Sequence, residues 1–471
     1  MMNSQTDSII EKVNPRWILL VVGLGTLMSS MTVSMVNLAL PSIGRDFSVT
    51  IEASRWVVQA FLLVNAVLLL PFGWLSDRIG HGRLYLIGFA VVGMGSLLCG
   101  LSNWFSLLIA GRVLQGLGGA MVMATGPALL TTHISPSKRG RALGILSTAT
   151  YLGLTAGPPL AGVIISELDW RWTFLVAVPV SVIVTIMGIL VFPPRKITAD
   201  KDSTKGRFDL PGAFALMLGL PLVLLALSQG RNGASSSILL MGGAGVVILI
   251  DFVFYELRVK SPLLDVRMFK TRNLSVASLS AVANYIALFT VLMLLPFYLE
   301  EGLGFSTAKT GMLLSAQPLM MALFATPSGW LSDRFGSRIF AKAGMGIMGI
   351  GLLGLSFADD NSCIAIIIVW LGLIGMGTGI FISPNSSMLM GSAPKTRQGV
   401  AGSVMAEARI MGMLFGVALA ATLFAKAGGT TGKVWTIVDF AAFQTAVRVG
   451  AGVAFLGMII TFFSTLNKKI Q

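Results

Sequence analysis

Hydrophobic residues along this chain gather in long runs that are separated by short polar connections. A window of about 20 residues predicts fourteen apolar segments, at approximately 16–40, 56–75, 84–102, 105–131, 141–166, 172–193, 210–229, 237–256, 274–299, 308–331, 339–358, 362–390, 399–425 and 446–466. Each run is long enough for a helix to cross the hydrocarbon core of a bilayer. The pattern predicts an all-α polytopic membrane protein with fourteen transmembrane helices.

The composition narrows the class further. Of the 471 residues, 55% are hydrophobic and 11% are charged, against about 25% charged in soluble domains. A secreted disulfide scaffold, a disordered chain and a nucleic-acid binder are therefore excluded. Cys99 and Cys363 lie in or beside apolar segments far apart in the sequence, so we interpret them as packing residues and expect no metal and no cofactor. The first segment lacks a cleavage site and is expected to remain in the mature protein.

The net charge of +14 is explained by the way in which the chain is oriented in the membrane. Of 34 Lys and Arg residues, 24 fall at the termini and in the connections that follow even-numbered segments, and 8 fall in the remaining connections. Positive charge accumulates on the cytoplasmic side of membrane proteins. Both termini are therefore predicted to be cytoplasmic, in the inner membrane of a prokaryote, with the excess charge facing anionic lipid.

An internal repeat divides the chain. Residues 73–80 (GWLSDRIG) and 329–336 (GWLSDRFG) follow the second and tenth segments and are identical at seven of eight positions. The fourth and twelfth segments also correspond in outline. We therefore predict a six-helix half at 1–193, two inserted helices at 194–272 and a second six-helix half at 273–471. Parallel repeats of this kind build secondary transporters that bind substrate between the halves.

Several motifs support one resemblance. They are residues 37–41 (NLALP), 112–116 (RVLQG), 170–174 (WRWTF) and 262–265 (PLLD), together with Gly153, Gly157, Pro158 and Gly162 in the fifth segment. With the repeated Gly-x-Leu-x-Asp-Arg-x-Gly sequence, the chain resembles the major facilitator superfamily, and within it the fourteen-helix drug:proton antiporters. The resemblance covers nearly the whole chain.

The resemblance implies roles for some of these residues. Asp77, Arg78 and Arg83, and in the second half Asp333 and Arg334, would form a conformational latch at the cytoplasmic ends of the helices. The alternative is that these residues only make a tight turn. The glycine and proline motif of the fifth segment would mark an exporter that exchanges substrate for a cation. Its alternative role is close helix packing.

Two charged residues are candidates for proton coupling. Arg112 lies inside the fourth segment, where a charge is costly unless it faces a cavity or a partner. Glu407 is the carboxylate deepest in the second half, and a carboxyl group in a low-dielectric site can exchange a proton near neutral pH. Arg409 lies two residues further, roughly 200° around the helix, so the two are not expected to pair. Asp251, in the eighth segment, is a weaker candidate.

The first segment departs from the family pattern, because Thr32 stands where an aspartate is common. A threonine cannot carry a proton at physiological pH. Either Glu407 and the latch carboxylates carry the coupling, or the protein is less strictly driven by protons. Polar residues expected to line a substrate cavity are Asn37, Gln59, Asn65, Gln115, Asn284, Tyr285, Gln317 and Asn385.

The sequence favours a monomeric secondary transporter that exports amphipathic, cationic organic compounds by alternating access in exchange for protons. Its partners would be a small-molecule substrate, protons and the lipid bilayer. A dedicated metabolite or lipid carrier with weak or no proton coupling is the alternative. A membrane enzyme is disfavoured, because only His81 and His133 are present and they lie far apart. A sensor is disfavoured because the connections are too short for an output domain.

Overall fold

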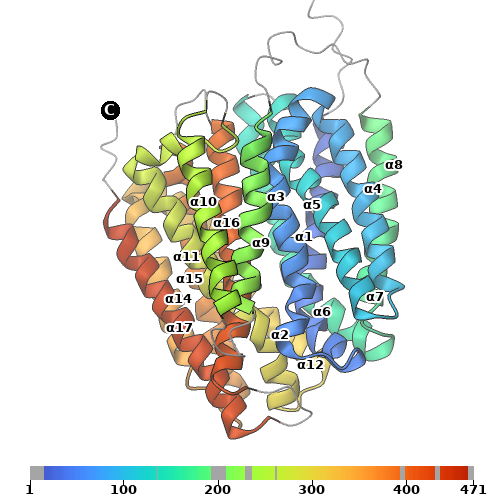
Figure 1. Cartoon of the computed structure of the whole chain (residues 1–471), viewed down its shortest axis with the longest axis vertical. Helices are drawn as coiled ribbons and strands as arrows, with labels where there is room; N and C mark the ends of the chain where they lie inside the picture. The colour runs from blue at the N-terminus through green and yellow to red at the C-terminus, as the bar shows by residue number, and fades with distance from the viewer. Residues whose placement is uncertain are drawn as a thin grey trace, which may run out of the picture.

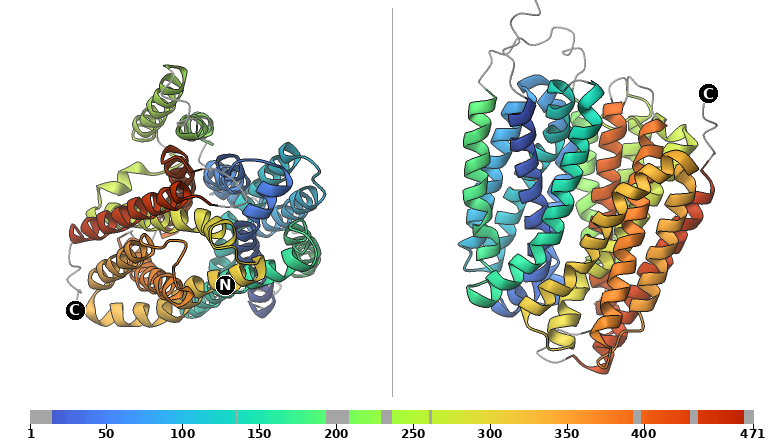
Figure 2. Two further views of the ribbon diagram at one scale, coloured as in Figure 1. Left: turned by 90° about the horizontal axis from the view of Figure 1, so that it is seen from below. Right: turned by 180° about the vertical axis from the view of Figure 1, so that it is seen from behind.

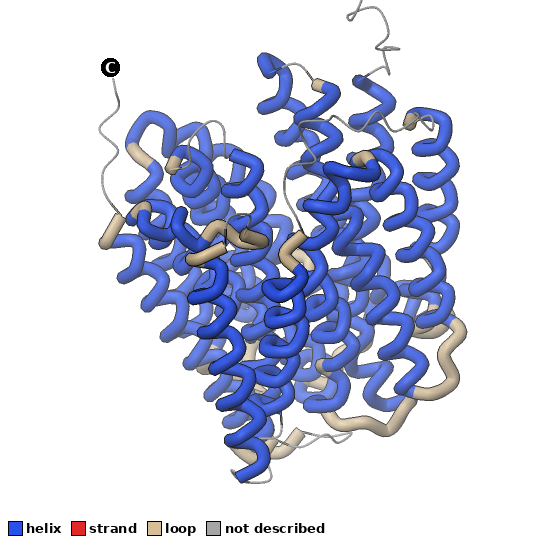
Figure 3. The backbone as a smooth tube through the Cα atoms, turned by 45° about the horizontal axis from the view of Figure 1, so that its top comes forward, coloured by secondary structure: helices blue, strands red, loops and turns tan. Residues whose placement is uncertain are grey.

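The computed structural model describes residues 15–134, 136–192, 208–228, 236–259, 262–392, 398–429 and 435–464, and helices are the only regular elements in these ranges (Figures 1 and 3). The first group of helices is α1 (Pro15–Asp46), α2 (Ile51–Ser54), α3 (Trp56–Ile79), α4 (His81–Gly100), α5 (Phe105–His133), α6 (Pro136–Glu167), α7 (Trp172–Leu175) and α8 (Ala177–Val191). Next come α9 (Leu210–Ser228) and α10 (Ser236–Glu256). The last group is η2 (Val266–Lys270), α11 (Arg272–Phe297), η3 (Tyr298–Gly302), α12 (Thr307–Leu314), α13 (Ala316–Phe335), α14 (Ser337–Leu355), α15 (Ile364–Gly391), α16 (Gln398–Lys426) and α17 (Ile437–Phe462).

Twelve helices of the described chain are long and apolar enough to cross a membrane. The other two expected segments are also helical but fall short of that standard. One is α9, whose apolar part is Leu210–Ala226. The segment expected at 308–331 is interrupted at Ser315 and forms α12 and α13. The last turn of α13 also carries Asp333 and Arg334, which lower its hydropathy.

Each of the first and last groups forms six membrane-length segments when α2 is counted with α3, α7 with α8, η3 with α11 and α12 with α13. The two six-helix groups are built from equivalent helix pairs. In the first group α4 packs on α5, α1 on α6 and α3 on α5, and in the second α14 packs on α15, α11 on α16 and α13 on α15. Glycines bring the helix backbones into close contact in the corresponding pairs α4–α5 and α14–α15. A Cβ added to Gly118 would lie 2.7 Å from the Val92 backbone nitrogen, and one added to Gly344 would lie 2.6 Å from the Phe381 backbone nitrogen. Small residues at such crossings allow helices to pack in van der Waals contact without a hydrophobic driving force.

The repeated eight-residue sequence forms the same turn twice. Gly80 and Gly336 have φ angles of 95° and end α3 and α13. This backbone conformation favours glycine. In both copies the glycine N–H donates to a serine carbonyl four residues earlier, Ser76 or Ser332.

The helices alternate in direction, which gives the bundle two ends. We call the end at which α1 begins the basic end, since the helix ends that flank the turns after α3 and α13 carry Arg78, Arg83, Arg334 and Arg338 on that side. The other is the distal end, at the bottom of Figure 1, near α2, α7 and α12. Helices α9 and α10 stand beside the two groups (Figure 2), where α9 contacts α3 and α16.

Candidate functional site

The two six-helix groups meet closely where α6 crosses α12, toward the distal end. The glycine and proline motif of the fifth segment forms this contact. A Cβ on Gly162 would lie 2.9 Å from the Ala308 Cα atom, and a Cβ on Gly311 would touch the Pro158 carbonyl. The other two motif glycines, Gly153 and Gly157, pack against α1. The motif therefore joins α1 and α6 within one group and places α6 against the other group.

An ion pair joins the groups at the same end. The Arg45 guanidinium, in the last turn of α1, donates to the Glu300 carboxylate at 2.8 Å. The Glu300 side chain is 3% exposed and the Arg45 side chain 45%. This pair was not predicted from the sequence, because charges at the ends of apolar runs were interpreted only as markers of orientation.

The predicted latch residues lie at the basic end and are exposed. Asp77 is 3.7 Å from the His81 ring nitrogen, and Arg78 stacks over Trp74 at 3.9 Å. The second copy repeats the stacking, with Arg334 over Trp330 at 4.3 Å. Arg83 and Asp333 are exposed as well. Within the residues described here, no ion pair crosses between the two groups at this end.

Arg112 is buried between α3, α4 and α5. Its Nε donates to the Val57 carbonyl at 2.5 Å and its Nη1 to the Gln115 amide oxygen at 2.6 Å. Gln115 in turn donates to Ser96 at 2.7 Å, and the guanidinium lies 4.6 Å from the Phe61 ring centre. No carboxylate pairs with Arg112 among the described side chains. The arrangement holds a buried cation with neutral acceptors and an aromatic face.

Glu407 and Arg409 contact different surroundings, as their spacing predicts. Glu407 is 8% exposed, and both its carboxylate oxygens are buried without a hydrogen-bond partner. Arg409 lies instead within electrostatic range of Tyr285 of α11 and of Tyr151 of α6. Tyr151 belongs to the first group and was not singled out from the sequence, since aromatic residues are common in every segment. Arg409, Tyr285 and Tyr151 therefore draw residues from both groups together.

Most of the other polar residues expected to line a cavity lie in contacts between or within helices. The Asn284 amide donates to the Met348 sulfur at 3.1 Å, and the Asn385 amide to the Ala277 carbonyl at 3.0 Å. Asn65 donates to the Phe61 carbonyl at 2.9 Å in its own helix. Asn37, Gln59 and Gln317 are buried. Thr32, at the position where an aspartate is common, donates to the Met28 carbonyl at 3.0 Å.

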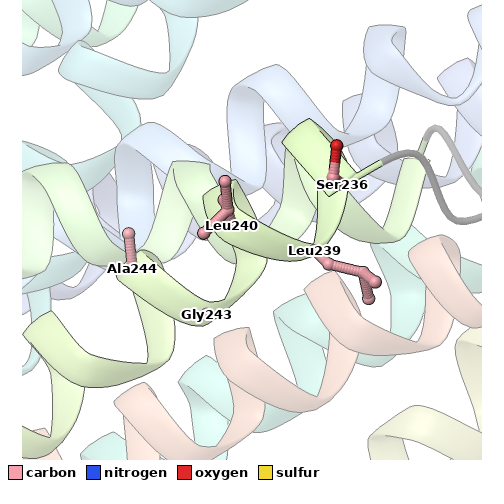
Figure 4. A pocket seen from close by; sticks show the side chains of 5 residues that line it. All are labelled: Ser236, Leu239, Leu240, Gly243 and Ala244. Carbon is pink, nitrogen blue, oxygen red and sulfur yellow. The ribbon is translucent and has the colours of Figure 1, made fainter.

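Asp251 is exposed on α10 and lies apart from these groups. Its helix also carries a shallow apolar hollow lined by Ser236, Leu239, Leu240, Gly243 and Ala244 (Figure 4). Neighbouring Val246, Val247 and Ile250 are about half exposed or more. Such a surface suits contact with lipid chains, and among its lining residues only Ser236, at the start of α10, carries a polar side chain.

Two repeated helical groups, joined at one end of a membrane-spanning bundle, define the class of a secondary transporter. The sequence profile of the Major Facilitator Superfamily matches residues 22–265 and 277–470. The chain belongs to this family, whose members are transporters and not enzymes.

Named relatives are similar over most of their length. The riboflavin transporter RibZ of Clostridioides difficile is 32% identical, with 95% of this chain and 97% of the relative covered. The multidrug resistance protein Stp of Mycobacterium tuberculosis is 29% identical, with 86% and 75% covered. The crystal structure of the human organic anion transporter MFSD10 (TETRAN) superposes with a TM-score of 0.63 at 15% identity and covers 95% of this chain and 99% of that chain, which supports the fold alone.

Proposed function

We propose that this transporter exports amphipathic organic compounds in exchange for protons. The observation that carries the proposal is Glu407, a carboxyl group buried in α16 with no partner for either oxygen. An isolated ionised carboxylate is costly in such a site, and binding a proton removes that cost. Glu407 can therefore load and release a proton as its surroundings change between two states, while Arg112 acts as the fixed positive charge of the first half.

Alternating access requires the two ends of the bundle to close in turn. The Arg45–Glu300 pair and the α6–α12 contact would keep the distal end closed. The latch carboxylates Asp77 and Asp333 would form their contacts in the opposite state, when the basic end closes. We propose that the basic end faces the cytoplasm, that all fourteen apolar segments cross the inner membrane, and that one chain forms the complete pathway as a monomer.

The substrate class is proposed from the relatives and the polar groups between the halves. Multidrug resistance proteins among the relatives favour a broad range of drug-like compounds. A dedicated metabolite carrier is the second candidate, favoured by the riboflavin transporter at 32% identity. Tyr151, Tyr285 and Arg409 suit a planar ring with a hydrogen-bond acceptor or a negative charge.

The test follows proton movement in proteoliposomes with an internal pH dye, while lipophilic cations, organic anions and riboflavin are added in turn. We expect substrate-dependent proton flux in the wild-type protein and none in Glu407→Gln. The matched control is Asp360→Asn, which removes a carboxyl group from an exposed connection. Substrate movement without protons would overturn proton coupling, and flux with riboflavin alone would favour the dedicated carrier.

A further inference from the structure

A second pair of carboxyl groups lies buried at the basic end of the inserted helices. Asp209 immediately precedes α9 and is 6% exposed, and Glu256 ends α10 and is 0% exposed. Oδ2 of Asp209 and Oε1 of Glu256 are both buried and without a hydrogen-bond donor. Both of these oxygens lie beside Gly212 of α9.

Gly212 leaves the space in which these carboxyl groups meet. A Cβ at this position would lie 2.5 Å from Asp209 Oδ2 and 2.7 Å from Glu256 Oε1. The two oxygens without donors therefore converge on one side of a single glycine. Any larger residue would occupy the space between them.

The other two oxygens are already satisfied by backbone donors. Gly212 N–H donates to Asp209 Oδ1 at 2.9 Å, which caps the start of α9, and Leu264 N–H donates to Glu256 Oε2 at 3.3 Å. A metal cation needs several oxygen ligands, but these neighbours present N–H groups. The two remaining oxygens therefore suit a pair made of one protonated carboxyl group and one carboxylate, in which the proton provides the hydrogen bond between them.

We propose that Asp209 and Glu256 form a binding site for one proton, which they share. Two adjacent ionised carboxylates would repel each other in a buried position, whereas a single shared proton gives a short, charge-assisted hydrogen bond. This site is separate from Glu407 and does not depend on the exchange of substrate for protons.

The shared proton ties three segments together at the basic end. Glu256 holds the backbone of the segment 262–265 through Leu264, and Asp209 follows Phe208, whose ring lies 4.8 Å from that of Trp74 in α3. Arg78 of the latch stacks on the same Trp74 ring. The inserted hairpin is thus attached to the latch helix of the first group.

The charged and titratable groups around the site come from each neighbouring element. Tyr255 interacts with Asp209 from α10. Asp265 accepts from the Arg267 backbone N–H, and the Arg267 guanidinium donates to the Leu257 carbonyl at 2.8 Å. Arg78 and Asp77 lie on α3, and Glu407 lies on α16, the other helix that α9 contacts. No described Lys or Arg forms an ion pair with Asp209 or Glu256.

The proton is detectable by infrared spectroscopy of the full-length protein in lipid nanodiscs, through the carbonyl stretch of a protonated carboxyl group at pH 7. We expect Glu256→Gln and Asp209→Asn each to lose one such band relative to wild type, because the new amide donates the hydrogen and the remaining carboxylate stays ionised. Asp360→Asn should leave the band unchanged. Glu407 contributes equally to all these samples and cancels in the differences.

Other outcomes would overturn the proposal. Loss of the band in only one variant would mean an isolated protonated carboxyl group, and loss in neither would mean no bound proton. A band that disappears when sodium or potassium is raised would mean a metal cation. Should either variant fail to fold, Gly212→Ala provides a second test. We expect it to lower the melting temperature by several degrees, while Gly243→Ala, whose Cβ would meet open space, leaves it unchanged. Equal melting temperatures would contradict the convergence of the two carboxyl groups.

Discussion

Removing Arg45 tests the proposal that the Arg45–Glu300 ion pair keeps the distal end closed. The Arg45→Ala substitution leaves Glu300, whose side chain is 3% exposed, without its cation. An unsatisfied buried polar group costs about 1–3 kcal/mol. Because Arg45 itself is 45% exposed, solvent screens the pair, and we take the lower part of that range, about 1–2 kcal/mol. This penalty applies only to the state closed at the distal end, since the pair is made there.

A loss of about 1–2 kcal/mol changes an equilibrium constant roughly 5- to 30-fold. The assay is pulsed electron–electron distance measurement between spin labels at Ser166 in α6 and Asp360, two exposed distal positions in different groups. The exposed Cys363 is replaced first, and Cys99 is buried. We expect the population with a long distance to grow by that factor in Arg45→Ala and by less in Glu300→Gln, which still accepts a hydrogen bond from Arg45.

The matched control is Arg448→Ala. Arg448 contacts Gln444 and Phe357 of its own group, so its loss should leave the distances unchanged. An unchanged distribution in Arg45→Ala would refute the reasoning, and so would equal shifts in the two variants.

Three further substitutions test other parts of the mechanism. Asp77→Asn should slow turnover more than it weakens substrate binding, measured by transport and equilibrium binding, and a pure loss of affinity would contradict a latch. Gly162→Leu should open the α6–α12 contact, seen as a longer Ser166–Asp360 distance, whereas Gly144→Leu, at a place with open space, should not. Arg112→Lys should lower the melting temperature by an amount equivalent to about 1–3 kcal/mol. The reason is that an ammonium lacks the planar fork with which the guanidinium donates to both Val57 and Gln115. An unchanged melting temperature would show that these hydrogen bonds contribute little.

The helices were predictable from the sequence because an apolar run of about 20 residues is typical of a membrane-spanning helix and of few other structures. The internal repeat was predictable for a similar reason, since the eight-residue sequence contains a glycine that the turn requires. The interruption at Ser315 was not predicted, because the window average over 308–331 masks Ser315, Gln317 and Pro318, although a proline in an apolar run is a signal for a helix break. Twelve of the fourteen expected spans satisfy the length and hydropathy of a membrane helix.

The candidate site was harder to predict, because its contacts join residues that are distant in sequence. Arg45 and Glu300 are 255 positions apart, and no local pattern relates them. Polarity alone was also a poor guide to cavity residues, since an asparagine can equally donate to a neighbouring helix, as Asn385 does. The expectation that Glu407 and Arg409 do not pair followed from helix geometry and needed no tertiary information, and no ion pair joins them in the described part of the chain.

The proposed alternating access requires each half to move as a unit. Within each group, glycines bring helix backbones into direct contact, as at Gly118 and Gly344, and such packing resists deformation. Between the groups, the distal contacts include the glycine crossing of α6 and α12 and the Arg45–Glu300 ion pair, whose cation is half exposed. Rigid halves joined by a few weak contacts move as units. Under the proposed mechanism, protonation of the buried Glu407 removes the cost of an isolated charge in one of two such states and so shifts the balance between them.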